Sequence, residues 1–372
     1  MRVAIAHDWL TGMRGGERVL EGLLDLLPQA EIFTLLHVPG SVSARIESRP
    51  IHTSFIDRLP LAARHYRSYL PLFPAAIERF DLRGYDLVVS SSHCVAKGVR
   101  PPPGVPHLCY CHTPMRYVWD LYDDYFGPGR AAPWVRAMMP PLARRLRQWD
   151  VDSADRVTRF IANSRHIRDR IRRCYGRDAG VVHPPVDVER FRPAATREDF
   201  YLIVSALVPY KRIDVAIEAF NRIGRRLVIV GDGPERGRLR RSARSNITFT
   251  GRVDDAEVAD WMGRCRAFIS TAEEDFGITA IEAQAAGAPV IAYGAGGAME
   301  TVVDAAAADD ACAATGLLFT PRTPDALAAA VRRFESLSFD PAALRAHAQR
   351  FDAQAFARGM RDELERWGRS GG

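Results

Sequence analysis

Both halves of the chain repeat one pattern, in which a short apolar run leads through a loop into an amphipathic stretch. In the first half the apolar run is 2–6, the glycine-rich loop is 12–17 and the stretch at helical spacing is 18–27. The second half repeats the order with an apolar run at 200–204 and a helical pattern at 214–221. Strand, loop and helix in this order are typical of a doubly wound α/β domain. The repetition predicts two Rossmann-like domains with parallel sheets, facing each other across a central cleft.

Further apolar runs extend the alternation of strands and helices along the chain. Runs of strand length lie at 32–36, 86–90, 105–111, 159–162, 226–230, 246–250, 267–270 and 288–293. Pro184 and Pro185 exclude a helix across 182–187, which we interpret as the linker between the domains. We therefore expect a first domain over 1–183 and a second over 184–352. A terminal helix over 353–372 can cross back to the first domain.

The composition supports a folded, non-membrane protein. A length of 372 residues suits two domains, and 47% hydrophobic with 26% charged residues excludes a disordered or coiled-coil chain. The longest uncharged stretch, 283–299, contains four glycines and a proline, so it is not a membrane span. The apolar run at the start is too short for a signal peptide, and the six cysteines show no disulfide framework. We expect a cytoplasmic protein.

The positive charge is concentrated in the first half of the chain. Residues 1–185 hold 26 basic against 18 acidic residues, a net charge of +8, whereas 186–372 hold 25 against 27. A basic surface attracts anionic ligands or membranes. The arginines are spread over the predicted helices rather than gathered among aromatic residues, so we expect no nucleic-acid partner. Lys97 and Lys211 are the only lysines, which suggests a role for the compact ammonium group at these positions.

Acidic residues directly follow the predicted strand at 267–270. Glu274 lies in the loop after this strand, and Glu282 lies eight residues later in the next helix. Gly277 allows close backbone approach at the start of that helix. Glu273 alone could simply be an acid at a helix N-terminus, but the cluster is placed where parallel sheets bind ligands. Two carboxylates there can accept hydrogen bonds from sugar hydroxyls.

Two more loops at strand ends carry groups that suit phosphate. After the predicted strand at 288–293, Gly296 and Gly297 lead into a helix, so their backbone N–H groups can hold a diphosphate. After the strand at 200–204, Lys211 and Arg212 can neutralise phosphate charge, Lys as a point charge and Arg as a fork.

The first half offers a histidine in the loop after its predicted strand at 105–111. His112 follows two cysteines, but no other cysteines have a spacing that completes a zinc site, so we expect no metal here. The Asp150-Val-Asp152 sequence lies in a charged, helical stretch, and we interpret it as surface.

These motifs together resemble the family-4 retaining glycosyltransferases of the GT-B fold, over nearly the whole chain. The resemblance is carried by Gly15-Gly16-Glu17-Arg18, the Lys211 loop, Glu274-x7-Glu282, and Gly296-Gly297 with Glu300-Thr301. It implies a hexosyltransferase that moves a sugar from a nucleotide diphosphate to an acceptor with retained configuration, without a metal or other cofactor.

The resemblance also implies roles for individual residues. His112, Lys211 and Glu274 are expected to be catalytic, with His112 against the transferred sugar and Lys211 on the donor phosphates. The expected donor-binding residues are Gly15, Gly16, Arg212, Gly233, Arg252, Phe276, Gly277, Ile278, Glu282, Gly296 and Gly297. One position departs from the family, which commonly has Arg five residues before the phosphate Lys, where this chain has Ala206. Arg212 or another arginine then substitutes, or phosphate binding is weaker.

The acceptor is expected to be a saccharide or a polyprenyl-linked saccharide. The segment 134–149 mixes arginines with Trp, Met and Leu, a pattern that suits either the surface of an anionic membrane or ordinary core packing. With the basic first half it favours peripheral contact with the inner face of the plasma membrane. The resemblance to enzymes that build bacterial polysaccharides favours GDP-mannose as donor. The alternatives are a UDP-sugar donor and a non-catalytic nucleotide-sugar-binding protein.

Overall fold

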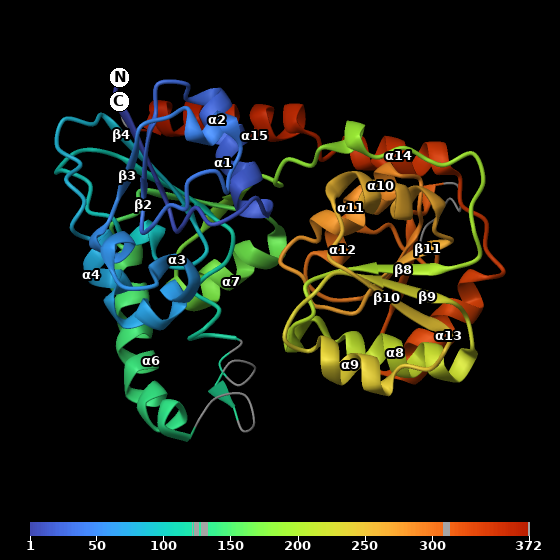
Figure 1. Ribbon diagram of the computed structural model, residues 1–372. Coiled ribbons are helices and arrows are strands. Elements are labelled where there is room, and N and C mark those ends of the chain that lie inside the picture. The colour runs from blue at the N-terminus through green and yellow to red at the C-terminus, as the bar shows by residue number, and fades with distance from the viewer. Residues whose placement is uncertain (121, 123–125, 128–132, 308–312, 371–372) are drawn as a thin grey trace. The chain divides into compact units, whose positions relative to one another are not determined.

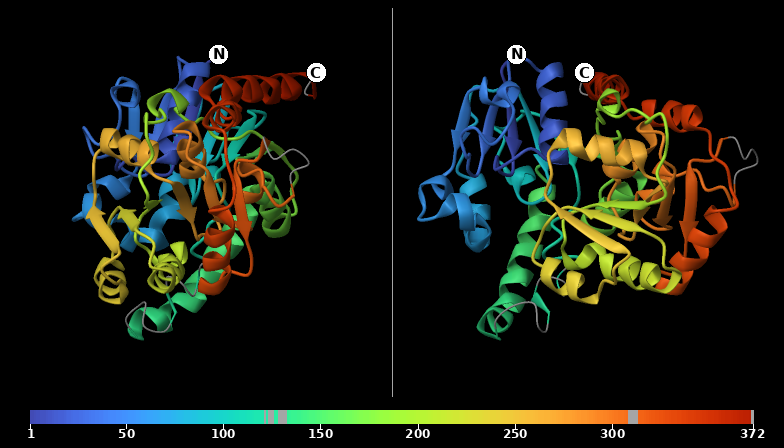
Figure 2. Two further views of the ribbon diagram at one scale, coloured as in Figure 1. Left: turned by 90° about the vertical axis from the view of Figure 1, so that its right-hand side faces the viewer. Right: turned by 45° about the vertical axis from the view of Figure 1, so that its right-hand side comes forward.

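The computed structural model describes residues 1–370 except 121, 123–125, 128–132 and 308–312 (Figure 1). The chain divides into two compact units, Met1–Pro185 with Gln354–Gly372, and Val186–Ala353. The division falls inside the proline-containing segment 182–187, and the terminal helix belongs to the first unit. Each unit is a parallel sheet with helices on both faces (Figures 1 and 2), which confirms the prediction of two Rossmann-like α/β domains.

The sheet of the first unit has the described strand order β3-β2-β1-β4-β5-β6-β7. Its strands are β1 (Val3–His7), β2 (Glu31–Thr34), β3 (Ile51–Thr53), β4 (Leu87–Ser92), β5 (His107–Cys111), β6 (Arg159–Ala162) and β7 (Ala179–Val181). Its helices are α1 (Gly15–Leu26), α2 (Ala44–Glu47), α3 (Ala62–His65), α4 (Phe73–Ile77), α6 (Pro133–Ala154), α7 (Arg165–Tyr175) and α15 (Ala353–Ser370), with 3-10 turns η1 (Phe55–Arg58), η2 (Tyr66–Leu72) and η3 (Ala96–Gly98).

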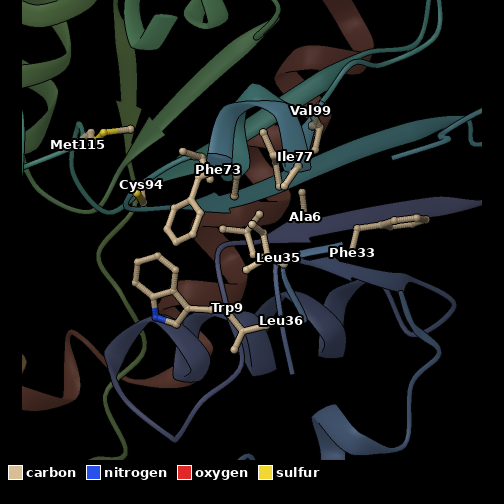
Figure 3. Packing of buried hydrophobic residues seen from close by; sticks show 14 of the residues in the cluster. Ala6, Trp9, Phe33, Leu35, Leu36, Phe73, Ile77, Cys94, Val99 and Met115 are labelled. Atoms are coloured by element: carbon tan, nitrogen blue, oxygen red, sulfur yellow. The ribbon is translucent and has the colours of Figure 1, made fainter. Parts of the chain in front are cut away.

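The alternation of side chains along β1 divides the core of this unit between the two faces of the sheet. Val3 and Ile5 pack with α1 and with Phe356 of α15, so the terminal helix closes one face. Ala4 and Ala6 point to the other face, where a second cluster gathers around Trp9. Figure 3 shows this second cluster, which includes Phe73, Ile77, Leu35 and Leu36. The sheet is therefore buried on both sides, as parallel sheets require.

The second unit repeats the arrangement with the strand order β10-β9-β8-β11-β12-β13. Its strands are β8 (Tyr201–Val204), β9 (Leu227–Val230), β10 (Ile247–Gly251), β11 (Ala267–Ser270), β12 (Val290–Tyr293) and β13 (Gly316–Phe319). Its helices are α8 (Ile213–Ile223), α9 (Arg236–Ser242), α10 (Asp255–Arg264), α11 (Ile278–Ala285), α12 (Ala298–Thr301), α13 (Pro324–Phe334) and α14 (Pro341–Gln349), with turns η4 (Val188–Arg190) and η5 (Pro209–Lys211). One core cluster joins Leu202 to α11 and another joins Ile203 to α8 and α13, so this sheet too is covered on both faces.

The structure differs from the sequence prediction at the first glycine loop. Helix α1 begins at Gly15 rather than at Arg18, so Gly15 and Gly16 form its first turn. The carboxylate of Glu17 accepts the backbone N–H of Arg14 at 3.0 Å, which stabilises the helix start despite the two weak helix formers. The short strands β3, β7 and β13 were not predicted. Among the described residues, no helix is both long and apolar enough to span a bilayer.

Candidate active site

The carboxyl ends of three neighbouring strands place polar side chains together in the first unit. Strands β1, β4 and β5 are adjacent, and His7 at the end of β1 is the register partner of Ser91 in β4. His112 follows β5 directly. Ser91 Oγ lies 3.1 Å from His7 Nδ1 and 2.8 Å from His112 Nε2. The predicted catalytic histidine is therefore held by residues of the sheet edge rather than standing alone in a loop.

The backbone around this edge is organised by a buried carboxylate, Asp8. Its oxygens accept four consecutive backbone N–H groups, those of residues 93–96, at distances of 2.6 to 3.0 Å. The ring nitrogen His93 Nδ1 lies 3.0 Å from the same carboxylate. Burial alone would raise the pKa of Asp8, but His93 and its hydrogen bonds hold the pKa well below its ordinary value. Asp8 thus fixes the loop after β4 as an ionised group.

His112 is half-buried and lies beside the first turn of α1. Its carbonyl accepts a hydrogen bond from Asn163 Nδ2 at 3.0 Å. Burial and the neighbouring His93 and His7 lower the pKa of His112 to about 3, so the imidazole is neutral at pH 7. A Cβ atom built on Gly16 would lie 3.9 Å from His112 Nε2 and 3.5 Å from His7. The structure therefore brings Gly16 and His112 together.

In the second unit the predicted phosphate lysine meets the acidic loop. Lys211 Nζ lies 2.6 Å from Glu274 Oε1, and both side chains are partly buried. Thr271 Oγ1 donates to the backbone oxygen of Lys211 at 2.8 Å, which joins the loops after β8 and β11. Arg212 adopts a left-handed backbone with φ of 49°, a conformation that is costly for a residue with a Cβ. Its guanidinium contacts Asp214 at 3.2 Å.

The glycine loop after β12 packs against this same acidic loop. Gly297 N–H donates to the carbonyl of Glu274 at 2.7 Å. A Cβ at Gly297 would lie 2.3 Å from Phe276 Cα, and one at Gly296 would lie 2.3 Å from the Glu274 carbonyl. Only glycine permits this approach, so Lys211, Glu274 and the two glycines form one constellation at the carboxyl edge of the sheet.

The other predicted donor-binding residues lie around this constellation. Gly277, with φ of 94°, is the N-cap of α11, so Phe276 lies just before the helix and Ile278 is its first residue. Glu282 lies on α11 with its Oε1 3.3 Å from Arg190 Nη2. Gly233 packs against the loop after β8, since its Cβ would lie 2.5 Å from the carbonyl of Leu207. Arg252 is exposed directly after β10 and Gly15 opens α1 in the other unit.

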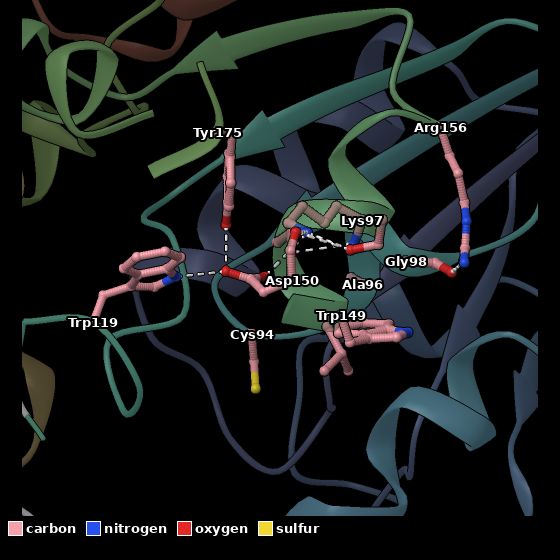
Figure 4. A network of polar contacts seen from close by, with 12 residues as sticks. Cys94, Ala96, Lys97, Gly98, Trp119, Trp149, Asp150, Arg156 and Tyr175 are labelled. Carbon is pink, nitrogen blue, oxygen red and sulfur yellow. Dashed lines mark hydrogen bonds and ion pairs between the residues drawn. The ribbon is translucent and has the colours of Figure 1, made fainter. Parts of the chain in front are cut away.

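The interpretation of Asp150 as a surface residue is wrong. Asp150 is fully buried, with its Oδ1 3.0 Å from Lys97 Nζ (Figure 4). Its Oδ2 accepts hydrogen bonds from Trp119 Nε1 at 2.8 Å and Tyr175 Oη at 2.9 Å. Lys97 is buried as well, and the pair ties α6 to η3, the turn that follows the loop held by Asp8. Asp152, two residues on, is exposed as expected.

Sequence reasoning missed His7, Asp8, Ser91 and this ion pair. The signal was present, because His7-Asp8 directly follows the first apolar run and Ser91 directly follows the run at 86–90. Such polar residues at strand ends could have been grouped with His112. Within the described ranges, no three His, Cys, Asp or Glu side chains gather as ligands for a metal ion.

Each of the two units matches the model of a known protein family. Residues 13–190 match the model of Glycosyltransferase Family 4, and residues 187–355 match Glycosyl transferases group 1. The chain is 34% identical to a GDP-mannose-dependent alpha-(1-6)-phosphatidylinositol monomannoside mannosyltransferase of Mycobacterium tuberculosis, over 52% of this chain and 56% of that protein. It is also 34% identical to D-inositol 3-phosphate glycosyltransferase 2 of Catenulispora acidiphila, over 46% and 49%. The chain thus spans about half the length of the curated relatives it matches.

Solved structures of other proteins superpose on nearly the whole length of this chain. Sucrose-phosphate synthase from Thermosynechococcus elongatus superposes with a TM-score of 0.72 at 18% identity, covering 100% of both chains. Anabaena Alr3699/HepE, solved in complex with UDP, gives a TM-score of 0.67 at 18% identity over 98% of this chain and 100% of that one. At this identity the likeness establishes the fold. The two family models together match residues 13–355, and on these matches the chain belongs to the family-4 glycosyltransferases, with the GT-B fold.

Proposed function

We propose that the chain is a hexosyltransferase that moves a sugar, with retention, from a nucleotide-diphosphate donor to a saccharide acceptor. The observation that carries this proposal is the contact of Lys211 with Glu274 beside Gly296 and Gly297. It combines a cation for phosphate and an acceptor for sugar hydroxyls at one sheet edge, where the two glycines let the loop after β12 pack on the acidic loop.

The chemistry follows from where charge develops. As the bond from the anomeric carbon to the diphosphate oxygen breaks, negative charge grows on that oxygen, and Lys211 would stabilise it. The acceptor oxygen bonds to the anomeric carbon on the same face, and its proton passes to the departing diphosphate. The lysine supplies the positive charge, so we propose a metal-independent reaction.

For the donor we propose GDP-mannose. Support comes from the Mycobacterium tuberculosis relative, whose name specifies GDP-mannose. The names of the inositol phosphate and phosphatidylinositol mannoside relatives describe polar, anionic acceptors. The basic first unit suits such acceptors, including a polyprenyl-linked saccharide.

The donor proposal is tested by calorimetric titration with GDP, UDP, ADP and dTDP, each with and without EDTA. We expect GDP to bind most tightly and EDTA to leave its affinity unchanged. Tightest binding of UDP would replace GDP-mannose by a UDP-sugar. Binding without any sugar transfer would favour a non-catalytic binding protein, and no binding at all would refute the site.

The role of Lys211 is tested by Lys211→Ala, for which we expect kcat to fall about 10²–10³-fold. Asp152→Ala is the matched control, because Asp152 is charged but exposed on α6 of the other unit. Equal rates for the two variants would refute the assignment of Lys211.

We also propose peripheral contact of α6 with an anionic membrane. Arg136, Met138, Arg144 and Arg145 are exposed on α6, whereas Leu146 is buried, so the described part of the helix offers a basic outer face with an exposed Met side chain. The side chains of Trp134 and Val135, part of the predicted segment, lie outside the described residues. We expect co-sedimentation with anionic but not neutral vesicles, abolished by Arg144→Glu with Arg145→Glu.

A further inference from the structure

A row of polar groups runs from Glu17 on α1 to His112 after β5, across the sheet edge of the first unit. Glu17 Oε1 lies 3.8 Å from His7 Nε2. His7 Nδ1 lies 3.1 Å from Ser91 Oγ, which lies 2.8 Å from His112 Nε2. Glu17, His7 and Ser91 are buried, so water does not compete with these contacts. We name this set the Glu17–His112 row.

The Ser91 hydroxyl makes all hydrogen bonds of the row point the same way, from donor to acceptor. It carries one proton, so it donates to one of the two histidine rings and accepts from the other. If it donates to His7, then His112 carries its proton on Nε2 and its Nδ1 is an acceptor. If it donates to His112, then His112 carries its proton on Nδ1. Which of the two arrangements forms depends on Glu17, at the other end of the row.

The Glu17 carboxylate favours the arrangement in which His7 carries its proton on Nε2. Burial alone would raise the pKa of Glu17, but its contact with His7 lowers it, so the group is an anion that only accepts hydrogen bonds. No hydrogen bond is formed to His7 Nε2 by any residue that the structure describes, and the carboxylate is the charge that faces it. A proton on Nε2 is attracted to the carboxylate, whereas a lone pair would be repelled. His7 Nδ1 then accepts from Ser91, and Ser91 accepts from His112 Nε2.

We propose that Glu17, His7 and Ser91 are positioning residues that hold His112 as its Nε2–H tautomer, with Nδ1 presented as an acceptor for a hydroxyl of the transferred sugar. This inference rests on the proposed function for its ligand and on the row alone for its tautomer. An unprotonated nitrogen of a neutral ring attracts a hydroxyl proton and does not attract a phosphate oxygen. His112 therefore recognises the sugar rather than the diphosphate.

Other charged groups near His112 do not reverse this direction. Asp8, which follows β1, is occupied by four backbone N–H groups and by His93. Burial disfavours a second proton on His112, and so does Arg116 in the segment after β5. Both keep His112 neutral, while the row decides which of its nitrogens holds the single proton.

The test is a long-range ¹H–¹⁵N correlation spectrum of the full chain labelled with ¹⁵N-histidine at pH 7.5. The His112 signals are assigned by their loss in His112→Gln, and those of His7 by their loss in His7→Gln. We expect both rings to carry a proton on Nε2 and none on Nδ1. A proton on Nδ1 of either ring would overturn the proposal, and this measurement needs no variant other than those used for assignment.

Glu17→Gln tests the cause. The Gln carbonyl can still accept the N–H of Arg14, which retains the helix start, while its amide N–H then faces His7 Nε2. Each hydrogen bond of the row should reverse, moving the His112 proton to Nδ1 and lowering kcat/KM about tenfold through one lost hydrogen bond. In a Ser91→Ala background the same substitution should leave the His112 tautomer unchanged.

An unchanged Nε2–H tautomer in Glu17→Gln would overturn the proposal, even if donor binding and transfer proceed normally. The reverse case is distinguishable, because the spectra do not depend on turnover. If both spectra show the expected tautomers but the chain transfers no sugar, the proposal about the row stands and the proposed function is refuted.

Discussion

Replacing Lys97 by Met is expected to destabilise the first unit far more than a surface substitution. Lys97 and Asp150 are both almost fully buried, and Lys97 Nζ contacts Asp150 Oδ1 at 3.0 Å and its backbone oxygen at 2.5 Å. Methionine fills a similar volume but leaves the buried Asp150 carboxylate without the cation that compensates its charge. Removing one partner of a buried pair typically costs about 3–5 kcal/mol.

This loss is measurable as a shift of the thermal transition of the first unit. For a domain of 150–250 residues, each kcal/mol lowers Tm by about 2–4 °C, so Lys97→Met should lower it by about 6–20 °C. Differential scanning calorimetry of the full chain follows the transition. Asp152→Asn, an exposed acid on the same helix, should change stability by no more than about 0.5 kcal/mol.

A second substitution tests the reasoning directly. Asp150→Asn in the Lys97→Met background removes both charges, while the amide oxygen can still accept from Trp119 and Tyr175. We expect at least half of the lost stability to return, because no uncompensated charge stays buried. A loss below about 1 kcal/mol for Lys97→Met, or no recovery in the double variant, would refute the account of the pair.

Three further outcomes are expected. Gly297→Ala should destabilise the second unit by about 1–3 kcal/mol in urea denaturation, because its Cβ would lie 2.3 Å from Phe276 Cα. Gly16→Ala meets only ordinary contacts, so it should retain or raise stability by about 0.4–1 kcal/mol yet weaken nucleotide-diphosphate binding in the same titration; unchanged binding would separate Gly16 from the donor site. Burial lowers the pKa of His107 from 6.5 to about 3, so only the unfolded chain gains this proton as pH falls from 7 to 5, and stability should fall by about 2 kcal/mol from this residue. His107→Gln should flatten that pH dependence of the unfolding free energy, and an unaltered slope would contradict the assignment.

Much of the fold followed from the sequence because periodicity is a local signal. The strand Arg159–Ala162 and the strand Ala267–Ser270 have the predicted bounds, since most of each is apolar. The acidic and glycine loops were placed in the candidate site for the same reason, as each directly follows such a run. Lys211 and Glu274 are 63 positions apart, yet strand ends of one parallel sheet bring them together.

The remainder depends on contacts that no local pattern contains. Asp150 resembles any acid in a charged helix, and its burial follows from Lys97, 53 positions earlier. The role of Glu17 in starting α1 and in facing His7 requires the register of β1 with β4, which sets His7 opposite Ser91. A single sequence does not specify such pairings, because they arise only when the sheet is assembled.

The scarcity of lysine gives this protein an unusual chemical handle. Of its two lysines, Lys97 has a side chain that is 2% exposed within the α6 ion pair, whereas 19% of the Lys211 side chain is exposed beside Glu274. An amine-directed acylating reagent therefore meets one accessible lysine, and that lysine lies in the proposed donor site. The rate at which Lys211 is acylated can then report occupancy of that site by any ligand, without a labelled substrate or an introduced probe.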